Sequence, residues 1–229
     1  MTKLHDAEFG DITVRRQALA RQVSLRIAPN GQLVISLPSY APLMAAKVLL
    51  KSSRGRIRAL LDDYHQRSAY THDQSIGKSH HLLIQSGPEL AVRQSGTRII
   101  LTVPDHLDAT SPIVQQQLKP TIVRTLRKEA KAYLPRRLQW LAEQHGFQYK
   151  AVKLTHASSR WGSCSSRGTI SLNIALMMLP FELLDYVLLH ELAHTREMNH
   201  SPRFWQEVAR VDPAYQVHRK ALKRYTPHI

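Results

Sequence analysis

The amino-acid sequence predicts an α+β fold, in which an N-terminal β-hairpin and helix precede a mixed region of strands and longer helices. Three observations carry this prediction. Short runs of alternating apolar and polar residues recur in the first half of the chain. One apolar helical period covers residues 113–144, and a second leads into a group of histidines after residue 180.

The N-terminal part is predicted to be a hairpin followed by a helix. Residues 23–27 and 33–37 alternate, and Asn30-Gly31 lies between them. This dipeptide between alternating runs is a strong signal for a tight hairpin turn. Apolar residues then recur at helical spacing over residues 42–63, which predicts a helix, and the polar residues 65–80 are expected to form a loop.

The middle of the chain repeats this order of strands and helix. Alternating runs at 81–85, 90–93 and 98–103 predict three strands. The helical period over 113–144 predicts one long helix, and Gly146 follows it as a C-terminal cap.

The C-terminal part contains two further strands and three shorter helices. Residues 149–156 and 169–172 alternate and predict strands. Pro180 stands at the head of the helix that carries the histidines. Helices are predicted over Pro202–Val211 and over residues 213–223.

Composition and charge narrow the cellular compartment and the binding partners that we expect for this chain. Cys164 is the single cysteine, so no internal disulfide forms and a reducing cytosol is expected. Residues 1–25 lack the apolar centre of a signal peptide, and no run reaches the length of a membrane span, so we expect a soluble cytoplasmic protein. A net charge of +15 is compatible with nucleic acid or a nucleotide as partner, but no nucleic-acid-binding motif accompanies it, and a solvated basic surface is the simpler interpretation.

The residues that carry chemistry form the pattern His-Glu-Leu-Ala-His at 190–194. Residues four apart lie on one face of a helix, so His190 and His194 can direct two imidazoles at one metal ion. Zinc suits imidazole, and a catalytic zinc takes three protein ligands, for which His200 is the candidate third. Glu191 can then serve as general base toward a water that the zinc activates.

The segment between the second and third histidines must turn sharply. The extended form of this pattern has glycine where this chain has Glu197, so we expect Asn199 to adopt the left-handed conformation in its place. The motif helix then ends near Met198. Ser201 and Pro202 have the order of an N-cap and a first helical residue, so a new helix begins there.

Other residues compete for these roles. Glu207 is an alternative third ligand, because a glutamate one helix further on serves in some related sites. Cys164 has little support as a nucleophile, since zinc chemistry needs none. Six other histidines lack matching partners and are interpreted as surface or hydrogen-bonded residues: His80, His81, His145, His156, His218 and His228.

Four segments together resemble the YgjP-like metallopeptidases, which are relatives of the SprT-like and WLM metalloprotease domains: Ser159–Cys164, Ile170–Asn173, Tyr186–His194 and Asn199–Trp205. The resemblance implies a zincin-like metallopeptidase core with one zinc ion per chain. It also implies His190, His194 and His200 as ligands and Glu191 as catalytic acid and base. We therefore expect a β-rich N-terminal region with one helix at 1–110 and a zinc hydrolase domain at 111–229, with a single packed unit as the alternative.

Several residues are candidates for the surroundings of the zinc. The segment Arg160-Trp161-Gly162-Ser163 is expected on a strand that borders the cleft, where its backbone could pair with an extended substrate. Trp161 and Cys164 are also explained by packing, and Gly162 by close approach of the motif helix. Asn173 and Trp205 are candidates for orienting the ligands, with core or capping roles as alternatives.

Three functions remain open at the level of sequence. The first is a zinc peptidase that acts on proteins or peptides, with a narrower form that cleaves proteins bound to DNA. The second is a metal-dependent nucleoside triphosphate pyrophosphohydrolase or phosphatase that uses the same base. The third is a basic nucleic-acid-associated protein with a zinc site, although a structural zinc is normally closed by four protein ligands.

Overall fold

The computed structural model describes residues 2–28, 31–227 and 229 and divides the chain into two compact units. The first contains residues 1–69 and 110–112, and the second contains 70–109 and 113–229. This division differs from the one predicted after residue 110. In the structure the strands before that point group with the second unit, because their apolar residues join the core beneath the long helix.

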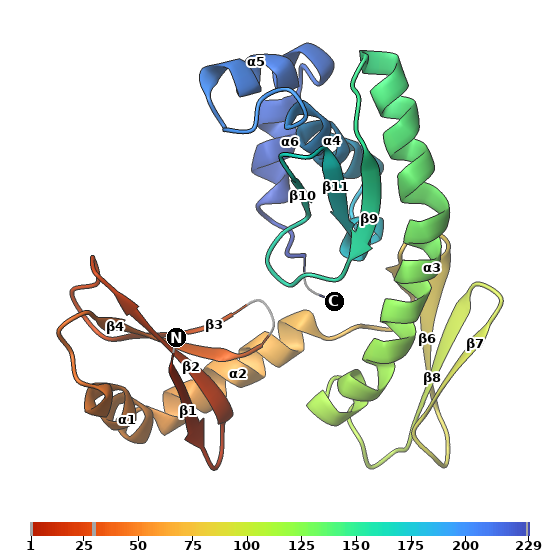
Figure 1. Ribbon diagram of the computed structural model, residues 1–229. Helices are drawn as coiled ribbons and strands as arrows, with labels where there is room; N and C mark the ends of the chain where they lie inside the picture. Colours follow the sequence, from red (N-terminus) through yellow and green to blue (C-terminus); the bar gives the residue numbers. More distant parts are fainter. Residues whose placement is uncertain (1, 29–30, 228) are drawn as a thin grey trace. The chain divides into compact units, whose positions relative to one another are not determined.

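The first unit is a four-stranded sheet with two helices (Figure 1). Its sheet order is β1-β2-β4-β3, and the strands are β1 (Thr2–Asp6), β2 (Gly10–Gln17), β3 (Ser24–Ile27) and β4 (Leu33–Pro38). The antiparallel pairing of β3 with β4 confirms the predicted hairpin. Pro29 and Asn30, which belong to the predicted turn, lie outside the described residues. The core of this unit centres on β4, whose residues are all buried.

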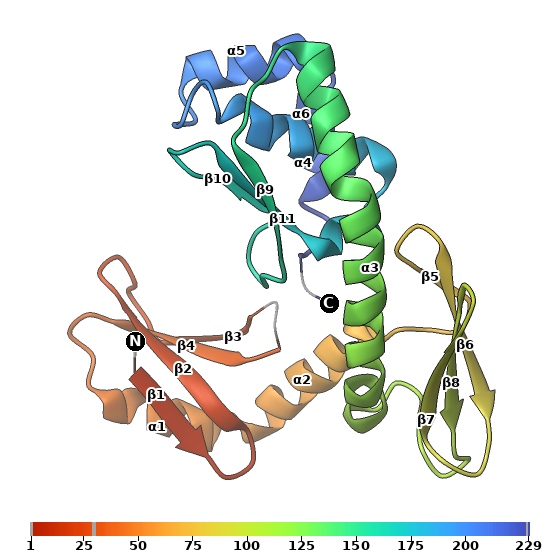
Figure 2. The same cartoon turned by 45° about the vertical axis from the view of Figure 1, so that its right-hand side comes forward.

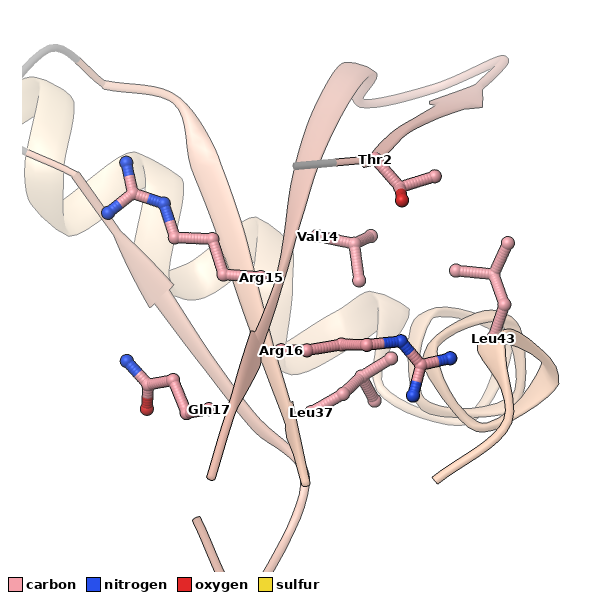
Figure 3. A pocket seen from close by; sticks show the side chains of 7 residues that line it. All are labelled: Thr2, Val14, Arg15, Arg16, Gln17, Leu37 and Leu43. Atoms are coloured by element: carbon pink, nitrogen blue, oxygen red, sulfur yellow. The ribbon is translucent and has the colours of Figure 1, made fainter. Parts of the chain in front are cut away.

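The predicted helix over residues 42–63 is wrong in one respect, because it is two helices. They are α1 (Leu43–Ser52) and α2 (Arg54–Ser68), and the backbone leaves helical geometry at Ser53 with φ −116° and ψ 18°. A pocket of about 440 Å³ lies on this unit beside the end of β2. Figure 3 shows Arg16 on the side of β2 that faces Leu37 and Leu43. Its guanidinium donates to the carbonyls of Ser39 and Ala41 at 2.7 and 2.8 Å, so it closes the turn into α1.

The second unit begins with a sheet in the order β5-β6-β8-β7. Its strands are β5 (Gln74–Ile76), β6 (His80–Ser86), β7 (Ala91–Ser95) and β8 (Arg98–Val103). The three predicted strands are confirmed, whereas the loop predicted over residues 65–80 is wrong at both ends. Its first residues continue α2, Gln74–Ile76 form β5, and His80 already begins β6. Ile76 is fully buried and ties β5 to the core.

The long helix α3 (Pro112–His145) is confirmed, and in Figures 1 and 2 it runs between the two sheets of the second unit. Its buried stripe recurs every four residues, as a helix requires of one face: Val114, Leu118, Ile122, Leu126, Ala130, Leu134 and Leu138. Gly146 ends the helix with a positive φ of 67°, as its predicted capping role demands.

The second sheet has the order β10-β11-β9 and carries the helices that hold the histidines. Its strands are β9 (Ala151–Thr155), β10 (Gly162–Cys164) and β11 (Thr169–Asn173). A 3-10 turn η1 (Ile174–Met178) leads to α4 (Phe181–Ala193), α5 (Pro202–Val211) and α6 (Tyr215–Leu222), and α4 packs against β10, α5 and α6. No helix among the described residues is long and apolar enough to span a membrane.

Candidate metal centre

The three histidines predicted as ligands come together at the end of α4. Each offers one ring nitrogen, and these three nitrogens lie within 4.8 Å of one another. His190 belongs to the last turn of α4, His194 caps that helix, and His200 precedes the N-cap of α5. The Nε2 atoms of His190 and His200 are 3.1 Å apart. Two nitrogens each about 2.0–2.1 Å from a tetrahedral zinc would be about 3.3 Å apart, so this spacing fits the metal.

The turn between His194 and His200 differs from the prediction. α4 ends at Ala193 rather than near Met198, and Asn199 is not among the described residues with positive φ. Instead the chain closes with short-range bonds, from Thr195 N–H to the Leu192 carbonyl at 2.9 Å and from Arg196 N–H to the Ala193 carbonyl at 3.0 Å. Bonds of this kind tighten a helix end without a left-handed residue.

The surroundings of His190 and His194 favour the neutral rings that a metal ion requires. Nδ1 of His194 lies 3.0 Å from the carbonyl oxygen of Glu197. A carbonyl can only accept, so Nδ1 carries the proton and Nε2 keeps its lone pair for a ligand bond. Burial, followed by the neighbouring histidines, lowers the pKa of His190 to about 3, and burial also lowers the pKa of His194. Both rings are therefore neutral near pH 7, which is the form that binds a metal.

Glu191 places a buried carboxylate next to the histidines. Its side chain is 6% exposed, and its Oε2 has no hydrogen-bond partner among the described residues. Burial raises the pKa of Glu191 to about 8, and the positive charge of Arg160 opposes that rise. A divalent cation at the histidines would favour the ionised form further. The donor set and this unpartnered oxygen both fit a bound metal ion.

The residues predicted to border the site lie at the edge of the second sheet. Gly162 and Ser163 belong to β10, which pairs with β11 on one side only. A Cβ at Gly162 would stand 2.7 Å from both Cγ and Oε1 of Glu191, so the strand runs directly against the carboxylate. Arg160 is exposed just before the strand, and Trp161 is partly buried against the core.

Asn173 and Trp205 were both candidates for orienting the ligands, and the structure places them differently. Asn173 donates from Nδ2 to the carbonyls of Ala157 and Arg160 at 2.6 and 2.9 Å and caps η1 through Oδ1, so it anchors the loop before β10. Trp205 stacks on His200 with ring centroids 5.7 Å apart and an interplanar angle of 28°. The indole therefore restrains a candidate ligand directly.

Several residues near the site were not anticipated. Phe204 stacks on His194, with ring centroids 4.4 Å apart. The guanidinium carbon of Arg219 lies 4.4 Å from the centre of the Trp205 ring. Tyr215 also stacks on Trp205, with ring centroids 5.6 Å apart. Residues 215 and 219 lie four apart in a predicted helix, so their common face was the signal available in the sequence.

Glu207, the alternative third ligand, does not join the histidines. Its carboxylate instead forms ion pairs with Arg196 and Arg210 at 2.8 and 3.2 Å.

Comparison with known proteins gives a family and a similar solved structure. The family model described as YgjP-like, metallopeptidase domain matches residues 21–225, which include the histidines and Glu191. The crystal structure of the metallopeptidase zymogen of Pyrococcus abyssi abylysin is 29% identical over 39% of this chain and 92% of that chain, with a TM-score of 0.35. No curated protein matches the chain.

Proposed function

Because the chain belongs to the YgjP-like metallopeptidase family, we propose that it hydrolyses peptide bonds with one zinc ion held by His190, His194 and His200. The observation that carries the proposal is the convergence of three imidazole nitrogens within 4.8 Å beside a buried carboxylate from the same helix. Protein or peptide is the substrate that the family implies. The family match adds no support for nucleic acid as a partner, which rests on charge alone.

The donor set supports zinc over other metals and a catalytic over a structural site. Three imidazoles suit zinc, whereas magnesium and calcium prefer oxygen ligands. Among the described residues the group contains three donors and no cysteine or carboxylate. A structural zinc is normally closed by four protein ligands, so three leave one position for water or substrate.

Glu191 is proposed as the acid and base of the reaction. A zinc ion, when bound, would polarise the scissile carbonyl and lower the pKa of the attacking water. Glu191 accepts a proton from that water and later delivers it to the leaving amine nitrogen. The buried environment of its carboxylate excludes bulk solvent from this proton transfer.

β10 is proposed as the strand that aligns the substrate. It is an edge strand that packs against α4, and Gly162 lies directly against the carboxylate of Glu191. An extended peptide that pairs with a free sheet edge is held by main-chain hydrogen bonds, which are indifferent to its sequence. Ser163 and Trp161 continue this edge on either side of Gly162, and Arg160 adds a positive charge beside it.

One assay separates the candidate functions. The zinc-loaded full-length chain and its Glu191→Gln variant are incubated side by side with an unfolded protein, a DNA-bound protein and nucleoside triphosphates. We expect fragments of the unfolded protein from the wild type and none from the variant. Release of phosphate or pyrophosphate that disappears in the variant, without any proteolysis, would establish the phosphohydrolase instead. Proteolysis that survives Glu191→Gln would reject the proposed site.

A further inference from the structure

We propose that Arg219 binds a carboxylate of the substrate, so that the site favours peptides with an acidic residue next to the scissile bond. The inference rests on the proposed peptidase function and names the class of substrate for that same site. It concerns a residue of α6, a helix that packs against the histidine-bearing helix α4.

Arg219 lies one aromatic ring away from two candidate ligands. Its guanidinium carbon is 4.4 Å from the centre of the Trp205 ring. That ring is in turn 5.7 Å from the ring of His200 and 5.9 Å from the ring of His190. The indole therefore holds the guanidinium within reach of a substrate bound at the histidines.

The guanidinium of Arg219 is available to a ligand. The side chain is exposed, and within the described part of the chain no carboxylate lies at ion-pair distance from it. The acidic residue closest in sequence, Asp212, is already engaged by Nδ1 of His218 at 2.8 Å and by the N–H of Ala214 at 3.1 Å. Glu191 is buried against β10 and is not offered to the surface.

A carboxylate is the group that this arrangement recognises. A guanidinium presents parallel N–H donors that match the two oxygens of a carboxylate, and stacking on an aromatic ring fixes their plane before the ligand arrives. Arg160, near Glu191, contributes a second exposed cation to the same surroundings.

The test compares matched peptides on matched variants. Cleavage sites of the zinc-loaded wild type in a reduced, unfolded protein are first mapped by mass spectrometry. Peptides that span one such site are then made with Glu or Gln next to the scissile bond, and kcat/KM is measured for each. We expect the wild type to prefer Glu by about tenfold or more, as a charge-assisted hydrogen bond provides. Arg219→Gln should reduce that ratio to near one while the rate on the Gln peptide stays within about threefold.

Lys220→Gln is the control, because it removes the same charge from the next, also exposed, residue of α6. It should keep the preference for Glu. Zinc content and melting temperature should match the wild type in both variants. A preference that persists in Arg219→Gln, or that is lost equally in Lys220→Gln, overturns the assignment.

Binding without turnover separates this inference from the proposed function. The affinity of the same two peptides for zinc-loaded Glu191→Gln, with and without Arg219→Gln, is measured by fluorescence anisotropy. Tighter binding of the Glu peptide that depends on Arg219 supports the inference even if no peptide is cleaved. If the wild type cleaves both peptides without preferring Glu, the role of Arg219 is rejected and the proposed peptidase function is retained. A phosphoserine peptide that binds well through Arg219 when the Glu peptide does not would assign the arginine to phosphate and overturn the carboxylate.

Discussion

Gly162 faces Glu191 so closely that a Cβ on the glycine would stand 2.7 Å from the Cγ of the glutamate and 2.7 Å from its Oε1. The backbone of Gly162 does not need a positive φ, so conformational freedom is not the reason for glycine at this position. Glycine is required for space, because the edge strand β10 and the helix α4 approach each other at this point. The missing side chain sets where the carboxylate of Glu191 can lie.

Gly162→Ala should therefore displace the proposed base. We expect a loss of about 1–3 kcal/mol in the free energy of unfolding of the metal-free protein, from the overpacking of a tight contact. Peptidase activity should fall about 100-fold, because a misplacement of about 1 Å at a reacting group has that effect. Zinc stoichiometry should stay at one per chain, since no ligand is touched. Chemical denaturation, metal analysis and peptide kinetics measure the three quantities.

A double mutant locates the cause of that loss. Adding Glu191→Ala to Gly162→Ala removes the atoms that the new methyl group meets, so the stability lost through Gly162→Ala should largely return. Ser163→Ala, at the neighbouring position of the same strand, should leave stability within about 0.5 kcal/mol of the wild type. Simple additivity of the Gly162 and Glu191 changes would show that the two residues do not compete for the same space.

Asn173 should matter for stability and not for metal affinity. It is 1% exposed. Its side-chain nitrogen donates hydrogen bonds to two carbonyls of the loop before β10, and its Oδ1 accepts a hydrogen bond from the N–H of Ala175. Asn173→Ala removes the hydrogen-bond partner of these backbone groups at a buried position, which should lower the free energy of unfolding by about 1–3 kcal/mol. Zinc titration of the folded variant should give the wild-type affinity. A tenfold weaker affinity would instead favour the ligand-orienting role.

Trp205 should act on the metal through His200. The stacked indole restrains the imidazole at a ring distance of 5.7 Å, and residues that orient a ligand typically contribute about 10- to 100-fold to metal affinity. Trp205→Leu keeps an apolar side chain in α5 but removes the stack, so zinc should dissociate more readily by about tenfold. Competition with a chelator measures this. Val217→Leu, an exposed change in α6, provides a variant that should leave the affinity unaltered.

Cys164 should react slowly with alkylating reagents at neutral pH. Burial, and then the negative charge of Glu191, raises the pKa of its thiol above the usual value of 9.0. The thiolate is the reactive form, so a raised pKa means less thiolate at any given pH and a rate profile displaced to higher pH. Iodoacetamide labelling of the folded chain between pH 7 and 10, with the urea-unfolded chain as reference, tests the direction. A folded chain that reacts faster near pH 7 would point to an activated cysteine.

The sequence predicts what depends on local spacing. The four-residue separation of His190 and His194 follows from helical geometry alone, and the capping order of Ser201 and Pro202 correctly predicts where α5 begins. The hairpin of β3 and β4 and the long helix α3 were likewise predictable from periodicity.

What depends on contacts between distant segments was not predictable. The turn after α4 is local and was missed for another reason: its N–H groups bond to carbonyls of the last helical turn, so no left-handed residue at Asn199 is needed. The sequence of β5 shows little alternation of apolar and polar residues. The strand is instead stabilised by Ile76, which is buried in the core that includes α3. Arg219 became a candidate only when α6 placed it on Trp205. The break at Ser53 between α1 and α2 likewise had no strong local signal.

The most direct test of the central claim is the rate of peptide hydrolysis by zinc-loaded Glu191→Gln, measured with the metal content of the same sample. The amide keeps the size of the side chain and cannot accept the proton of the attacking water. We predict one zinc per chain and a rate at least about 1,000-fold below the wild type, of the order lost when an essential proton-transfer group is removed. A variant that holds one zinc and cleaves peptides at the wild-type rate would contradict the account.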